Sequence, residues 1–142
     1  LEPMAGKVIH CGSSGAGQAA KLCNNMVLAV QQIAVGEAFV LAEKLGLSAQ
    51  SLFDVITGAT GNCWAVHTNC PVPGPVPTSP ANNAFKPGFA TALMNKDLGL
   101  AMDAVGSTGA SAPLGTHAAR IYAEFAEEHA DLDFSAVIEM LR

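Results

Sequence analysis

Two polar side chains spaced by one helical turn are the clearest candidates for catalysis in this sequence. Lys21 and Asn25 follow a glycine-rich turn, and the apolar periodicity after that turn predicts a long helix. Residues at positions i and i+4 lie on the same face of a helix, so the ammonium and the amide can reach one shared ligand. A lone lysine is most often a solvated surface group. In the first turn of a helix, however, the helix dipole disfavours its charge, which makes Lys21 a candidate proton donor.

The glycine turn itself is not a dinucleotide fingerprint. Gly12, Gly15 and Gly17 form a G-x-x-G-x-G pattern instead of G-x-G-x-x-G, and no strand–helix–strand unit follows them. From spacing alone, the glycines are better explained by a tight turn that lets a helix start close against a strand.

Other residues could belong to a site or simply to the fold. Lys96 and Asp97 are adjacent opposite charges, and residue type alone favours an exposed charged pair. Trp64 alone would be interpreted as a core aromatic residue.

No metal site is predicted. The cysteines, Cys11, Cys23, Cys63 and Cys70, are too few and too irregularly spaced for a disulfide scaffold, so reduced thiols fit better. His67 lies between two of them, but no CxxC or HxxxH completes a set of four zinc ligands.

The elements that must position these residues are helices. The longest apolar pattern predicts a helix over residues 18–45, with Gly46 placed to end it. Apolar residues cover most of its circumference, so we expect it to be central and packed on nearly every side. Ser48 can cap a second helix, which Gly58 would close.

Periodicity predicts three later helices, over residues 93–105, 113–128 and 134–141, the last capped by Asp133. Residues 70–87 contain six prolines and predict a long loop, a feature that in compact domains is more often functional than idle.

A single short strand is predicted over residues 7–11, where side chains alternate. A lone strand leaves its backbone donors and acceptors unpaired, so it should belong to a sheet elsewhere. We therefore expect residues 1–17 to be the last strand and glycine turn of a preceding domain. Residues 18–142 should form an all-α domain around the long central helix.

Composition constrains the partners. Hydrophobic residues make up 50% of the chain and charged residues 13%, so we expect a homo-oligomer, dimer or tetramer, or a further domain to cover apolar surface. A net charge of −5 without a basic cluster argues against nucleic acid. Residues 26–42 are the most apolar run but are interrupted by polar residues, so no membrane span is predicted. Residues 1–7 lack a basic region followed by an apolar stretch, so no signal peptide is predicted.

Two extended motifs resemble the β-hydroxyacid dehydrogenase family. One is Gly12-x-x-Gly15-x-Gly17-x-x-x-Lys21-x-x-x-Asn25, and the other is Phe89-x-x-x-Leu93-x-x-Lys96-Asp97-Leu98-x-Leu100-Ala101. Cys63-Trp64, the turn Pro71-Val-Pro73-Gly74 and Ala81-Asn82-Asn83 resemble 3-hydroxyisobutyrate dehydrogenases more than tartronate semialdehyde reductases or 6-phosphogluconate dehydrogenases. The resemblance covers nearly the whole chain.

The resemblance implies a helical substrate and dimerisation domain of the 6-phosphogluconate dehydrogenase C-terminal type. It would follow a Rossmann domain that binds most of NAD or NADP and would take a small 3-hydroxy acid. Lys21 would be the general acid/base and Asn25 would hydrogen-bond the same oxygen, because hydride transfer leaves an alkoxide that both groups stabilise.

The resemblance also assigns binding residues. Gly17, Trp64 and Asn69 would bind substrate, although related enzymes often carry Tyr-Asn where this chain has Asn69 and Cys70. The cofactor side would be formed by Lys96, Asp97 and Phe89.

Two alternatives stay open, a non-catalytic helical dimerisation or interaction domain and a tartronate semialdehyde reductase or serine dehydrogenase-like member. A pure interaction module has no need of Lys21 with Asn25. The expected location is the cytoplasm of a bacterium or, in a eukaryote, the mitochondrial matrix, and this chain by itself should be inactive.

Overall fold

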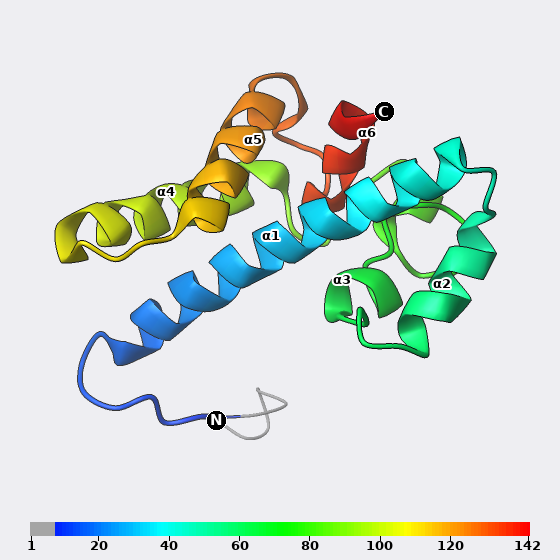
Figure 1. The fold of residues 1–142 in the computed structure, drawn as a ribbon. Helices are drawn as coiled ribbons and strands as arrows, with labels where there is room; N and C mark the ends of the chain where they lie inside the picture. The colour runs from blue at the N-terminus through cyan, green and yellow to red at the C-terminus, as the bar shows by residue number, and fades with distance from the viewer. Residues whose placement is uncertain (1–7) are drawn as a thin grey trace.

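The structure, a computed structural model, describes residues 8–142 and is built from helices (Figure 1). The predicted all-α fold is confirmed. Six α-helices and two 3-10 helices follow in the order α1 (Ala16–Lys44), α2 (Ala49–Thr57), α3 (Trp64–His67), η1 (Pro80–Asn83), α4 (Thr91–Thr108), α5 (Pro113–His129), η2 (Phe134–Val137) and α6 (Ile138–Leu141).

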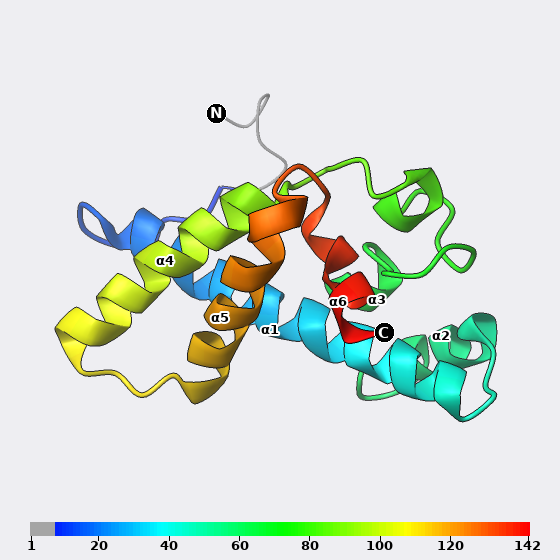
Figure 2. The ribbon, with the colours of Figure 1, turned by 90° about the horizontal axis from the view of Figure 1, so that it is seen from above.

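Helix α1 is the axis of the domain, as predicted. Its 29 residues extend about 44 Å at 1.5 Å per residue, and it ends just before Gly46, whose φ of 78° suits glycine. Helices α4 and α5 pack beside one part of α1, while α2 and α3 lie at its C-terminal end (Figure 2). By length and composition α1 could cross a membrane, with mean hydropathy 1.5 in its most apolar window. Helix α1 contacts six other helical segments, α2, α3, α4, α5, η2 and α6.

The expectation that α1 is packed on nearly every side is wrong for its first half. Every buried residue of α1 lies from Ala29 onward, whereas Cys23 and Val27 are exposed. Among the described residues, α4 and α5 are the helices that lie beside this half, and one side of it is not covered by a helix (Figure 1).

The predicted strand is not formed. Lys7 lies outside the described residues, and Val8–Cys11 have no regular secondary structure. No strand occurs anywhere in residues 8–142, so there is no sheet edge that could satisfy the backbone of this segment. At Gly15 the chain takes a φ of 87° and enters α1, which explains a glycine at this position.

The caps predicted from sequence are confirmed. Ser48 Oγ accepts a hydrogen bond from the Ser51 amide at 3.1 Å, and Gly58 follows the end of α2. Asp133 Oδ1 accepts one from the Ser135 amide at 3.0 Å. The helix predicted after Asp133 is divided into η2 and α6, and the proline-rich segment 70–87 contains only η1.

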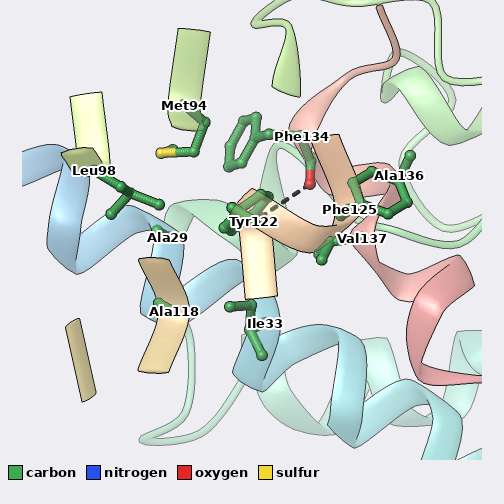
Figure 3. Close-up of a cluster of buried hydrophobic side chains, with 10 residues drawn as sticks. All are labelled: Ala29, Ile33, Met94, Leu98, Ala118, Tyr122, Phe125, Phe134, Ala136 and Val137. Carbon is green, nitrogen blue, oxygen red and sulfur yellow. Dashed lines mark hydrogen bonds between the residues drawn. The ribbon is translucent and has the colours of Figure 1, made fainter. Parts of the chain in front are cut away.

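Two apolar cores stabilise the fold. The first lies between α1, α4, α5 and η2, where Tyr122 and Phe134 are fully buried (Figure 3). The second joins the C-terminal half of α1 to α2, α3 and the start of the proline-rich loop, around Phe39 and Val66. Both cores hold the loop and the start of α4 against α1, which positions the side chains described next.

Candidate active site

Lys21 and Asn25 project from the first turns of α1 toward a carboxylate on α4. Asn25 Nδ2 donates to Asp97 Oδ2 at 2.7 Å, and Lys21 Nζ lies 3.9 Å from the same oxygen. The Lys21 side chain is 56% exposed and that of Asp97 only 10%. We call these three residues the lysine cluster.

The position of Asp97 differs from the expectation of an exposed charged pair with Lys96. Lys96 is exposed on α4, but Asp97 is buried and faces α1. Adjacent residues on a helix point about 100° apart, so only one of the two can face α1. The carboxylate fixes the Asn25 amide through one N–H and leaves the second N–H free to donate to a ligand.

Three other candidate residues meet at a separate hollow. Trp64, Asn69 and Phe89 line a space of about 410 Å³ together with Thr68, Thr78, Pro80, Gly88, Asp133 and Phe134. Trp64 is 46% exposed, so it is not a core residue. We call this space the aromatic hollow. It lies between α3, the proline-rich loop and the start of α4.

The floor of the aromatic hollow carries a buried polar network. Asn69 Nδ2 donates to Gln32 Oε1 at 3.2 Å and to Asp133 Oδ1 at 3.3 Å, and Gln32 Nε2 donates to the Asn69 carbonyl at 3.4 Å. All three residues are 5% exposed or less. Both N–H groups of Asn69 are therefore occupied, which leaves its side-chain oxygen as the polar atom for a ligand.

The lysine cluster and the network share one face of α1. Asn25 is one turn beyond Lys21, and Gln32 is about two turns further, so these three side chains lie along one stripe. Phe89 precedes α4 and Asp97 lies within it. Helix α1, and helix α4 with the residues just before it, thus position both the lysine cluster and one wall of the aromatic hollow. Gly17 is exposed in the first turn of α1, and no other residue lies within 4 Å of its Cβ direction.

Burial shifts two pKa values near this region. Desolvation raises the pKa of Tyr122 well above its ordinary value, and the carboxylate of Asp133 raises it further. Tyr122 is therefore a neutral hydrogen-bond donor, and its hydroxyl donates to the Phe134 carbonyl at 3.0 Å (Figure 3). Burial also raises the pKa of the Cys70 thiol. In residues 8–142 no three His, Cys, Asp or Glu side chains are grouped as a metal would require.

Sequence reasoning missed Gln32 as part of the site and interpreted Asp133 only as a helix cap. Gln32 gave one signal, a polar side chain within the most apolar stretch of the chain. The role of Asp133 depends on its neighbours from residues 69 and 88–89, which no local pattern reveals.

Comparison with known proteins identifies the family of this chain. Residues 15–141 match the family model described as the NAD-binding domain of NADP-dependent 3-hydroxyisobutyrate dehydrogenase. The chain belongs to this family.

Members with close sequences include the probable 3-hydroxyisobutyrate dehydrogenases of Mycobacterium bovis and Mycobacterium tuberculosis. Each is 87% identical over 142 residues, which cover all of this chain and 48% of the relative. The mitochondrial 3-hydroxyisobutyrate dehydrogenase of Homo sapiens is 43% identical over 98% of this chain and 42% of its own length. The chain therefore spans about half the length of the curated relatives it matches.

Solved structures of the family share the fold. The Mycobacterium tuberculosis 3-hydroxyisobutyrate dehydrogenase with L-serine superposes with a TM-score of 0.98 at 87% identity, over 100% of this chain and 49% of that one. A Salmonella typhimurium 3-hydroxyisobutyrate dehydrogenase gives a TM-score of 0.77 at 27% identity, over 89% of this chain and 42% of that one.

The family implies NAD or NADP, and the residues described here fit one end of that cofactor. Phe89, which lines the aromatic hollow, and the exposed Lys96, next to Asp97 on α4, are the residues that would hold the nicotinamide end. Residues 8–142 contain no strand–helix–strand unit to hold the phosphates, so this part of the chain fits only the reactive end of the cofactor.

Proposed function

We propose that the complete protein is an NAD(P)-dependent oxidoreductase that oxidises 3-hydroxyisobutyrate, or a similar 3-hydroxy acid, to its semialdehyde. The observation that carries this proposal is the lysine cluster, in which a buried Asp97 holds Asn25 at 2.7 Å beside the exposed amine of Lys21. A surface lysine without a task would not need a buried carboxylate and an amide arranged around it.

Lys21 is the proposed general acid/base. In the oxidation, its neutral amine takes the hydroxyl proton of the substrate, and in the reverse direction its ammonium returns a proton to the aldehyde oxygen. The free N–H of Asn25 donates to the same oxygen and stabilises the charge that develops there. NAD(P), when bound, supplies the hydride acceptor.

The proposed substrate-side residues Trp64 and Asn69 line the aromatic hollow. Trp64 provides apolar contact, and the side-chain oxygen of Asn69 provides an acceptor. Gly17 leaves open space beside the lysine cluster, which suits the close approach of a ligand. Lys96, Phe89 and Asp97 form the proposed cofactor side, with Asp97 acting through Asn25 and Lys21.

The proposal also includes a further domain of the protein and its self-association. A Rossmann domain in the rest of the protein would hold the cofactor phosphates, residues 1–17 would belong to its end, and the 142-residue chain alone should be inactive. The identity of 87% to mycobacterial proteins favours the bacterial alternative, the cytoplasm. We expect neither a membrane nor a nucleic acid as a partner.

Self-association is supported by an apolar surface on α1. Three hollows of about 350, 370 and 220 Å³ follow one another along this helix. Successive hollows share Met26 with Ala112 and then Val30 with Leu114, so they form one continuous groove. We call it the α1 groove, and a second copy of the protein is its proposed occupant.

The test is an assay of the complete protein with 3-hydroxyisobutyrate, L-serine and glycerate, each with NAD⁺ and with NADP⁺. We expect formation of the reduced cofactor, measured by absorbance, to be fastest with 3-hydroxyisobutyrate. L-serine is included because a solved relative is described with it, so preference for L-serine would favour the serine dehydrogenase-like alternative. If the protein turns over none of the three acids, the result would favour the alternative of a non-catalytic dimerisation or interaction domain.

A further inference from the structure

Asp133 is a buried carboxylate that the proposed chemistry does not use. Its residue is 1% exposed, and none of the salt bridges among residues 8–142 includes it. Burying a charge without hydrogen bonds is costly, so its partners must compensate. Five donors do so, from the amides of Gly88, Phe89 and Ser135 and the side chains of Ser135 and Asn69.

The two oxygens of this carboxylate bind two different segments that line the aromatic hollow, described below as its two walls. Oδ2 accepts from the Gly88 and Phe89 amides at 3.1 and 3.0 Å, on the wall before α4. Oδ1 accepts from Asn69 at 3.3 Å, on the wall that follows α3. These donors belong to residues that themselves line the hollow together with Trp64.

Other hydrogen bonds also fix the walls, but each of them contacts only one of the two walls. The start of α4 is also fixed by the Thr91 amide to the Leu132 carbonyl at 2.8 Å, and Phe134 donates to the Phe89 carbonyl at 3.0 Å. Asn69 is also fixed to Gln32 on α1. Only the Asp133 side chain among these groups contacts both Asn69 and the Gly88–Phe89 backbone.

We propose that Asp133 is a positioning residue that sets the separation of Phe89 from the Asn69 and Trp64 wall, and thereby determines which acid fits the hollow. This inference rests on the proposed function. A charged carboxylate suits the task because it accepts several bonds at fixed geometry on both oxygens. It contacts no reacting group, so its loss should change substrate fit more than proton transfer by Lys21.

The variant that tests this is Asp133→Asn in the complete protein. An amide keeps the size of the side chain, but one of its two ends becomes a donor and must face N–H groups on one wall. We expect KM for 3-hydroxyisobutyrate to rise by ~10-fold or more with a smaller change in kcat. The ratio of kcat/KM for 3-hydroxyisobutyrate to kcat/KM for the smaller 3-hydroxypropionate should decrease. An unchanged KM and preference in the folded variant would overturn the inference.

Two further variants distinguish positioning from stability alone. Ser135→Ala removes the 2.6 Å hydroxyl bond to Asp133 Oδ1 but neither wall contact, so melting temperature should fall while KM stays unchanged. Asn69→Ala releases one wall and should lower the preference for 3-hydroxyisobutyrate over 3-hydroxypropionate in the same way. This variant therefore tests the positioning role if Asp133→Asn does not fold. Equal shifts of KM in Ser135→Ala and Asp133→Asn would contradict the proposed role.

A readout independent of activity uses Trp64, the one tryptophan of this chain. In the 142-residue chain, Asp133→Asn should increase quenching of Trp64 fluorescence by acrylamide, and Ser135→Ala should not. If the wild-type complete protein oxidises no 3-hydroxy acid, the proposed function fails while this measurement still decides whether Asp133 joins the walls. Unchanged quenching in Asp133→Asn would overturn that link.

Discussion

Replacing Lys21 by alanine in the complete protein removes the amine placed 3.9 Å from Asp97 and beside Asn25. General acid–base groups typically contribute about 10²–10⁴-fold, so kcat should fall by at least that order. Cofactor affinity should change little, because the phosphates would be held outside this chain. Steady-state kinetics with a separate cofactor-binding titration measure both effects.

The control for charge is Lys21→Arg, since a guanidinium keeps the positive charge but does not readily release its proton. Near-normal turnover in Lys21→Arg would show that the lysine acts only as an electrostatic anchor.

Asn25→Ala should lower kcat less than Lys21→Ala does, by about 10–10³-fold, because it removes one neutral hydrogen bond and keeps the proton donor.

At the scale of elements, the approach of α5 to α1 depends on Gly115. A Cβ at this buried glycine would lie 2.8 Å from Met26 Cγ, too close without a shift of that side chain. Gly115→Ala should therefore destabilise the fold or fail to stabilise it, because overpacking costs about 1–3 kcal/mol against a gain of about 1 kcal/mol in helix propensity.

The matched control is Gly106→Ala, also inside a helix, where a Cβ would meet no other residue within 4 Å. It should raise the free energy of unfolding by up to about 1 kcal/mol. Urea titrations followed by circular dichroism compare the two variants. If Gly115→Ala were as stabilising as Gly106→Ala, the close contact between α1 and α5 would be wrong.

At the scale of the whole molecule, the uncovered half of α1 should drive self-association. Val27 lies in the α1 groove and is 52% exposed, so a second copy can bury it. Val27→Lys should raise the dissociation constant of the dimer by ~10-fold or more, about 1.4 kcal/mol, as measured by sedimentation equilibrium.

Val55→Lys is the control, because Val55 is 63% exposed on α2 and lines none of the three hollows that form the groove. It should leave the association constant as in the wild type. A monomer at high concentration in the wild-type chain would contradict the proposed occupant of the groove.

Local sequence predicted the four longer helices, α1, α2, α4 and α5, but not the short α3 and η1. Apolar periodicity, Ser48 and Asp133 as caps, and Gly46 and Gly58 at helix ends act within a few residues, and the structure confirms each of them. The spacing of Lys21 and Asn25 on one helical face is likewise a local property. The strand over residues 7–11 could not be determined in this way, because a strand needs a partner that periodicity does not supply.

Tertiary structure alone decided what surrounds those side chains. Asp97 contacts Asn25 across 72 positions, and Asp133 contacts Asn69 across 64, so neither pairing leaves a local signal. The same holds for α1, whose apolar residues look equivalent along its length although its buried residues begin only at Ala29. Composition gave the number of apolar residues, but the packing of α4 and α5 decided which of them remain exposed.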